Sequence, residues 1–125
     1  MSPARLRRVC LALPGAVEEF PFNPGTSVFK VGGKMFALSN LSRKPLSISL
    51  KCEPELAEGL RGAHDAIRPG YHLNKRHWNT VTLDSSLPER MVLELIEDSY
   101  DLVVAGLPSS KRAELGLTPP PTASQ

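Results

Sequence analysis

The sequence is poor in aromatic residues and has no long apolar run. Only 6% of its 125 residues are Phe, Trp or Tyr, so its core must consist mainly of Leu, Val and Ile. No apolar stretch approaches the roughly 20 residues that a helix needs to cross a bilayer. We therefore expect a single domain with one hydrophobic core and no membrane association, because the length also suits one domain.

Cysteine is scarce as well. Cys10 and Cys52 are widely separated and form no Cys-x-x-Cys pair, which removes the usual zinc and dithiol motifs. We expect reduced, structural thiols in a cytoplasmic protein, while a disulfide between the two stays open. The first residues, with arginines before a short apolar stretch, resemble a signal peptide. Pro14 and two glutamates follow, so we interpret them as a helix instead.

No pattern of catalytic or metal-binding residues stands out. His72 and His77 lack the four-residue spacing of a helical zinc site, and no Cys/His pair has a spacing that favours nucleophilic catalysis. The segment GGK at 32–34 lacks the complete phosphate-loop pattern and fits a hairpin turn. We therefore expect no enzyme activity, no metal site and no cofactor.

The net charge is only +2, but the charges are segregated along the chain. Residues 30–76 contain nine Lys/Arg against four Asp/Glu, whereas residues 84–101 contain one basic and six acidic residues. A domain with one basic region offers that region to an anionic partner. Alternatively, the two regions face each other or are solvated. We interpret one acidic helix face as solvated surface: Glu94, Glu97, Asp98 and Asp101.

Hydrophobic periodicity predicts a helix near each end of the chain and a shorter one between them. Ser2-Pro3 is typical of a helix start. Ser86 and Glu89 stand in a capping-box arrangement before the long last helix. The middle helix would bury Leu56 and Leu60. The apolar stripe of the first helix would be Leu6, Val9, Cys10 and Leu13.

Short alternating segments predict five strands, at 17–22, 26–31, 34–40, 46–51 and 78–83. The order is then α-β-β-β-β-α-β-α. It predicts an α+β two-layer sandwich, an antiparallel β-sheet with helices packed on one face. The domain would span residues 1–115, and the Pro-rich residues 116–125 would form a disordered tail.

The opposite face of this sheet would be open. Alternation assigns to it Val28, Lys30, Ser47, Ser49, Lys51, Trp78, Thr80 and Thr82. Such a hydroxyl-rich, basic surface can hydrogen-bond phosphates and stack a base. A lone Trp is also often a packing residue, so the sequence leaves the exposure of Trp78 open.

The segment RPGYHLNKRHWNTV at 68–81 holds the single Trp and two of the three His. It resembles the hallmark segment of the MmcQ/YjbR family of small bacterial proteins. The resemblance covers about residues 4–115, because four further segments are also similar. They are LPG at 13–15, FKVGGKMFAL at 29–38, SLKCEPE at 49–55 and EDSYDLVVAGLP at 97–108.

The resemblance implies a frataxin/CyaY-like fold and DNA binding through a "double wing" of strands and turns. Frataxin likeness also raises an iron-related role. However, the first helix carries Arg5, Arg7 and Arg8 instead of the carboxylates that iron requires. A protein–protein interaction module using the same Trp and Arg surface is a further alternative. A small-molecule site between the loop and the sheet is another.

These considerations single out a set of residues for contact with DNA or another anionic partner. Basic side chains would contact phosphate, Asn74 a base edge or the backbone, and His77 or Trp78 would stack. The motif implies positions 68, 72, 74, 75, 77 and 78, while position 76 lies at a variable place in it. We expect a monomer. The complete set is Arg68, His72, Asn74, Lys75, Arg76, His77, Trp78, Lys51 and Lys30.

Overall fold

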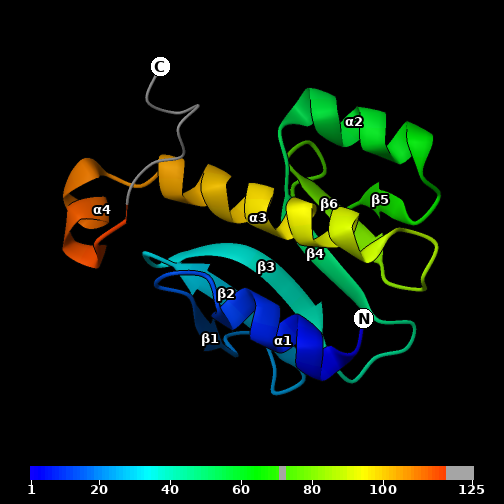
Figure 1. Cartoon of the computed structure of the whole chain (residues 1–125), viewed down its shortest axis with the longest axis horizontal. Helices are drawn as coiled ribbons and strands as arrows, with labels where there is room; N and C mark the ends of the chain where they lie inside the picture. The colour runs from blue at the N-terminus through cyan, green and yellow to red at the C-terminus, as the bar shows by residue number, and fades with distance from the viewer. Residues whose placement is uncertain (71–72, 118–125) are drawn as a thin grey trace.

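The computed structural model describes residues 1–70 and 73–117, and Figure 1 shows how the elements are arranged. The helices in these residues are α1 (Pro3–Leu11), α2 (Pro54–Ala63), α3 (Glu89–Ala105) and α4 (Ser109–Leu115). The strands are β1 (Val17–Glu19), β2 (Thr26–Val31), β3 (Lys34–Asn40), β4 (Ser47–Lys51), β5 (Ile67–Pro69) and β6 (Trp78–Thr82).

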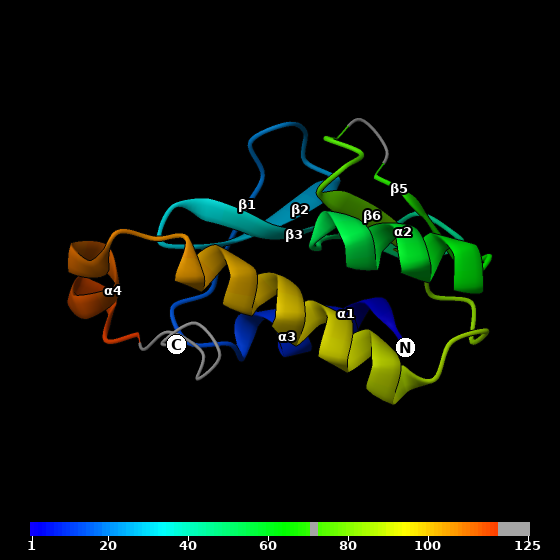
Figure 2. The same ribbon diagram turned by 90° about the horizontal axis from the view of Figure 1, so that it is seen from above.

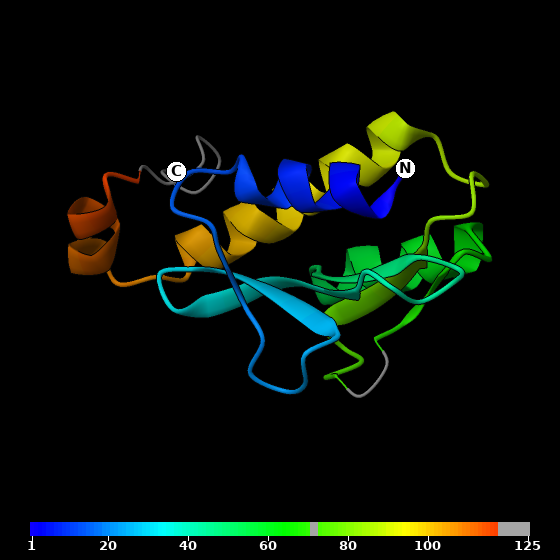
Figure 3. The ribbon, with the colours of Figure 1, turned by 90° about the horizontal axis from the view of Figure 1, so that it is seen from below.

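The strands form one antiparallel sheet in the order β1-β2-β3-β4-β6-β5. Helices α1, α2 and α3 lie on one face of this sheet, and no described helix lies on the other (Figures 2 and 3). The predicted α+β two-layer sandwich is therefore confirmed. None of the helices in the described residues is long and apolar enough to cross a membrane.

Helix α1 begins as the sequence predicts. The Ser2 hydroxyl accepts a hydrogen bond from the Arg5 backbone N–H at 3.1 Å, and Pro3 is the first helical residue. Leu6 and Cys10 of its predicted stripe are completely buried, and the stripe packs on the sheet. The cysteines are free, and both are buried.

The expected starts and buried sides of the other helices are partly wrong. Helix α3 starts after Pro88 with no side-chain cap. Ser86 is instead held in a turn by the Asp84 carboxylate, which accepts its backbone N–H at 3.1 Å. Helix α2 buries Ala57, whereas Leu56 is 50% exposed and Leu60 half-buried. Helix α2 therefore leaves part of its apolar side uncovered.

Two strand predictions also differ from the structure. Strand β1 ends at Glu19, so Phe20 and Phe22 belong to the β1–β2 loop instead of the sheet. Strand β5 was not predicted, because it is only three residues long and contains Pro69. Pro is tolerated there because β5 is an edge strand.

The β2–β3 hairpin turn is confirmed at Gly32 and Gly33. Their φ angles are 60° and 80°, a conformation that suits glycine. A Cβ atom on Gly32 would lie only 2.6 Å from a methyl carbon of Leu107, so the turn also packs tightly against the segment that follows α3. Of the tail predicted to be disordered, residues 116–125, Leu117 packs against the core, and residues 118–125 lie outside the described residues.

A hydroxyl group from α3 completes the sheet where its strands separate. Strands β3 and β4 share only two register pairs. Beyond them, the Ser99 hydroxyl donates to the Phe36 carbonyl at 2.6 Å and accepts from the Lys51 N–H at 2.8 Å. Towards the other end, the Ser39 hydroxyl donates to the Ser47 carbonyl at 2.6 Å. Serine hydroxyls thus replace missing backbone hydrogen bonds along this seam.

We predict that Ser99→Ala lowers the free energy of unfolding by about 1–3 kcal/mol, since Ser99 is fully buried and its loss leaves two backbone groups without a partner. Urea denaturation followed by circular dichroism measures this. Ser110→Ala on exposed α4 is the control and should change stability by less than about 0.5 kcal/mol. Equal stabilities of the two variants would contradict a role for Ser99 in the sheet.

Candidate nucleic-acid interface

The predicted open face exists, and the register shows which residues share it. One row crosses the whole sheet on the side away from the helices: Glu19, Val28, Leu38, Ser49, Thr80 and Arg68. Neighbouring rows pair Lys30 with Met35, Ser47 with Thr82 and Lys51 with Trp78. The residues assigned to this face by alternation therefore do lie together on it.

The centre of this face is less accessible than a flat, hydroxyl-rich sheet would be. Val28 is 1% exposed and Ser49 5% exposed. The hydroxyls of Ser49 and Thr80 are 2.8 Å apart and hydrogen-bond to each other. Arg68, at the β5 edge of the same row, is exposed. A bound molecule would therefore meet the rim of the face before its floor.

Two loops project from the open side of the sheet, as Figure 3 shows. One joins β1 to β2 and the other joins β5 to β6, and both lie on the side opposite α1 and α3 in Figure 2. The β1–β2 loop carries Phe20 and Phe22, which are 51% and 66% exposed. Sequence reasoning missed these two side chains because it placed them in a strand. The signal in the sequence was the composition of EFPFNPG, in which two Phe residues alternate with the turn residues Pro, Asn and Gly.

The β5–β6 loop is built around Asn74. Its side-chain oxygen accepts a hydrogen bond from the Arg76 backbone N–H at 3.0 Å. Its backbone carbonyl oxygen accepts one from the Trp78 backbone N–H at 3.0 Å. The Lys75 ammonium donates to the Gly70 carbonyl at 3.1 Å. Asn74 therefore has a structural role in shaping the loop, whereas Lys75 and Arg76 are exposed.

Arg61, which the sequence analysis did not single out, anchors this loop from the helix side. Its Nε donates to the Asn79 side-chain oxygen at 2.6 Å, and its Nη2 donates to the Trp78 carbonyl at 3.2 Å and to the Lys75 carbonyl. Asn79 also donates to the Ala57 carbonyl of α2 at 3.4 Å. One guanidinium thus joins α2, β6 and the basic loop.

The single Trp is buried. Trp78 is 9% exposed although it lies on the open side of the sheet. The Gly70 backbone packs against it, because a Cβ atom on Gly70 would lie 2.8 Å from the Trp78 Cβ. The Gly70 N–H also donates to the Trp78 carbonyl at 2.8 Å. Trp78 therefore supports the loop, and the expectation that it stacks on a bound base is wrong.

The remaining predicted residues differ in exposure and in whether they form an ion pair. Lys30 forms an ion pair with Glu19 at 2.9 Å, which partly neutralises it. Lys51 and His77 are half-exposed. His72 lies outside the described residues. The cations of this rim that form no ion pair with any described residue are Arg68, Lys75, Arg76 and Lys51.

Neither cysteine has the properties of a nucleophile. Burial, assisted by the charge of Glu18, raises the pKa of the Cys10 thiol to about 12. Burial and the nearby charge of Asp98 raise the pKa of the Cys52 thiol above its ordinary value. Both thiols are therefore protonated at neutral pH, and thiolates are what catalysis requires.

Comparison with known proteins identifies the family. The family model YjbR matches residues 11–102, most of the chain. This chain belongs to the YjbR family. The YjbR protein of Escherichia coli strain K12 is 40% identical over 112 residues, which cover 90% of this chain and 95% of the relative. YbdF of Escherichia coli O157:H7 is 41% identical over 101 residues, 81% of this chain and 83% of the relative.

Solved structures of relatives share the fold. A Deinococcus radiodurans crystal structure superposes with a TM-score of 0.89 and is 46% identical, covering 99% of this chain and 95% of that one. A Pseudomonas syringae crystal structure gives a TM-score of 0.72 at 30% identity, covering 82% of this chain and 99% of that one. The YjbR resemblance of the 68–81 segment is thus confirmed.

We predict that Arg61→Lys loosens the β5–β6 loop even though it keeps the positive charge, because an ammonium cannot make the same forked contacts. Amide exchange at Gly70 and Trp78 should accelerate about tenfold, the effect of losing roughly one hydrogen bond. Trp78 emission should shift to the red. Arg90→Lys is the control, since the Arg90 side chain is 91% exposed and, among the residues that the structure describes, pairs only with Glu94. Unchanged exchange at both amides would show that Arg61 does not hold the loop.

Proposed function

We propose that this YjbR-family protein is a small, non-enzymatic nucleic-acid-binding protein that acts through the open side of its sheet. The observation that carries this proposal is the pairing of two loops on that side, one aromatic and one basic. Cations beside exposed aromatic rings are the combination that binds a flexible strand of nucleic acid, because phosphates and bases are met together.

The basic loop and its neighbours would contact phosphates. Lys75 and Arg76 are exposed on a loop whose shape Asn74 and Arg61 maintain. Arg68 stands at the sheet edge, and Lys51 at the end of β4. With about four such contacts, non-specific affinity should be weak, about 10⁻⁴ to 10⁻⁶ M at physiological salt.

The β1–β2 loop would supply the stacking surface that Trp78 cannot provide. Phe20 and Phe22 are exposed by half or more, although large apolar side chains gain free energy when they are covered. Stacking on a base would cover them, and unpaired bases present their faces freely only in a single strand. We therefore expect single-stranded nucleic acid to bind more tightly than a duplex.

A protein-interaction module is the second candidate. Val17 is 48% exposed and lies near Phe20 and Phe22 in the chain, so the β1 edge carries several apolar side chains that a protein partner would cover. An iron-related role has less support, because the Glu18 and Glu19 carboxylates are paired with Arg7 and Lys30. In addition, no group of three or more His, Cys, Asp or Glu converges among the described residues.

We predict steep salt dependence for binding of a labelled single strand, followed by fluorescence anisotropy. About four phosphate contacts imply a loss of about fiftyfold in affinity between about 50 and 200 mM salt. Lys75→Ala with Arg76→Ala should reduce the slope of log K against log salt by about 1.4. The matched control is Arg8→Ala with Lys111→Ala, which removes two charges from α1 and α4 on other surfaces. Equal slopes for both double variants would rule out the basic loop as the binding site.

We predict a different signature for Phe20→Ala with Phe22→Ala. Each stacked base contributes about 1–3 kcal/mol, so affinity for a single strand should fall at least tenfold while the salt slope stays unchanged. Duplex binding should change much less. Absence of any binding at low salt by the parent protein would remove nucleic acid as the partner. The exposed phenylalanines would then direct the search to proteins.

A further inference from the structure

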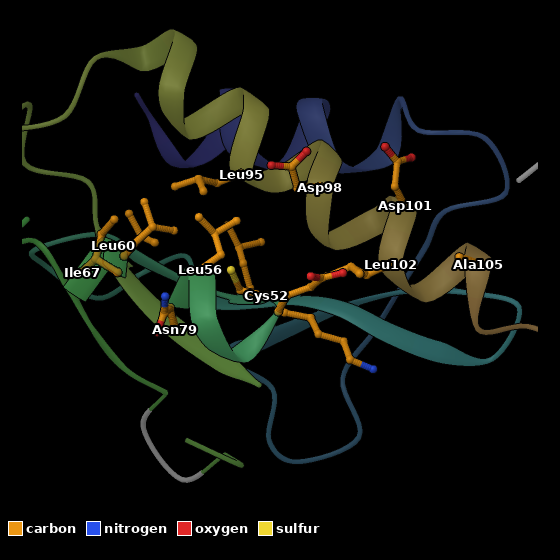
Figure 4. A pocket seen from close by; sticks show the side chains of 14 residues that line it. Cys52, Leu56, Leu60, Ile67, Asn79, Leu95, Asp98, Asp101, Leu102 and Ala105 are labelled. Carbon is orange, nitrogen blue, oxygen red and sulfur yellow. The ribbon is translucent and has the colours of Figure 1, made fainter. Parts of the chain in front are cut away.

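A pocket of about 430 Å³ lies on the other side of the sheet, between α2 and α3 (Figure 4). Its volume is within the range of sites for small organic molecules. The β4, β5 and β6 strands form its floor, where Leu50, Ile67 and Val81 are buried. The sheet therefore separates this pocket from the proposed nucleic-acid interface.

The walls of the pocket are apolar side chains that the fold leaves partly uncovered. Leu56 and Leu60 come from α2, and Leu95 and Leu102 from α3. Leu56 is 50% exposed, and the other three are only half-buried. The two helices thus hold their apolar sides apart over a gap that neither fills. An apolar ligand would gain free energy by covering these side chains.

Two carboxylates stand on the α3 edge of this pocket. Asp98 and Asp101 are one turn apart, so they lie on the same face of the helix, as Figure 4 shows. Neither forms an ion pair with any residue that the structure describes. Desolvation raises the pKa of both carboxyl groups, and neighbouring carboxylates add to the effect. A cation at this edge would offset that repulsion.

The polar groups of the pocket argue for a reversible, non-covalent ligand. The Cys52 thiol is kept protonated by burial and by the charge of Asp98. The Asn79 side chain is already occupied, since it accepts from Arg61 and donates to Ala57. The charged groups of the lining that form no ion pair with a described residue are the carboxylates of Glu53, Asp98 and Asp101 and the ammonium group of Lys51, so negative charge outnumbers positive charge there. Charge complementarity then selects the sign of the ligand.

We propose that this pocket binds a small organic cation, an ammonium group attached to an apolar aromatic or alkyl body. The apolar body would lie between Leu56 and Leu102, and the ammonium group would face Asp98 and Asp101. The site and the nucleic-acid interface occupy opposite faces of the sheet, and the residue they share is Lys51 at the end of β4.

Three indole compounds test the proposal, because they share one body and differ in charge. Tryptamine is the cation, tryptophol the neutral analogue and indole-3-acetate the anion. We expect tryptamine to bind with a Kd of about 0.1–1 mM, as suits a ligand of this size. Tryptophol should bind about fivefold more weakly, the effect of losing one or two partly exposed ion pairs, and indole-3-acetate more weakly still. Amide shifts in two-dimensional NMR spectra should cluster on α2, α3 and the end of β4.

Two double variants test whether Asp98 and Asp101 cause the preference for tryptamine over tryptophol. Asp98→Asn with Asp101→Asn should make tryptamine bind no better than tryptophol. Glu94→Gln with Glu97→Gln is the matched control, since it removes the same charge from the same helix outside the pocket lining, and it should change affinity less than about twofold. Circular dichroism verifies that both fold. A loss as large in the control would overturn the assignment of the two aspartates.

Alkylation of Cys52 gives an independent readout. Cys10 is 0% exposed and Cys52 9% exposed, so maleimide should modify Cys52 before Cys10, slowly because the thiol is protonated, and tryptamine should slow that modification further. Equal affinities for the three indoles would overturn the proposal. It would also be overturned by shifts confined to the β1–β2 and β5–β6 loops, or by no binding at millimolar concentration.

Discussion

The hydroxyl group of Ser99 is the contact on which the two-layer arrangement depends. It comes from the middle of α3, is fully buried, and satisfies one carbonyl of β3 and one N–H of β4. Helix α3 is thereby attached to the sheet backbone by direct hydrogen bonds as well as by packing. Buried backbone groups must be paired. The gap between β3 and β4 at Phe36 and Lys51 is therefore tolerated only because α3 supplies the Ser99 hydroxyl there. The hydrogen bond to Ser99 fixes the end of β4 at Lys51. The nucleic-acid interface lies on one face of the sheet at this end, and the pocket between α2 and α3 lies on the other.

Much of the fold could be predicted because it follows from local patterns. Alternation in β4 and β6 assigned Ser47, Ser49 and Thr80 to the open side, since side chains on a strand point to opposite faces in turn. The Ser2 cap and the Gly32-Gly33 turn are also local features. The family motif adds Arg68 as a candidate contact, and the register places Arg68 beside Thr80 in the row that crosses the open face.

The rest could not be predicted because it depends on contacts between distant residues. Arg61 reaches the basic loop only after α2 has packed on β6, and no periodicity signals that. Trp78 is buried because Gly70 comes back against it, although alternation alone places it on an open face. The acidic pattern of the last helix predicts solvated surface at Asp98 and Asp101, because a sequence pattern does not reveal that α2 lies across a pocket from them.

The seam between β3 and β4 divides the sheet into two halves. Strands β1, β2 and β3 form one, β4, β6 and β5 the other, and only two register pairs with the Ser99 and Ser39 hydroxyls join them. The β1–β2 loop with Phe20 and Phe22 belongs to the first half, and the β5–β6 loop belongs to the second. The position of one loop relative to the other therefore depends on the geometry of this seam. A small change in twist there would widen or narrow the space that a bound strand must fit, without altering either loop.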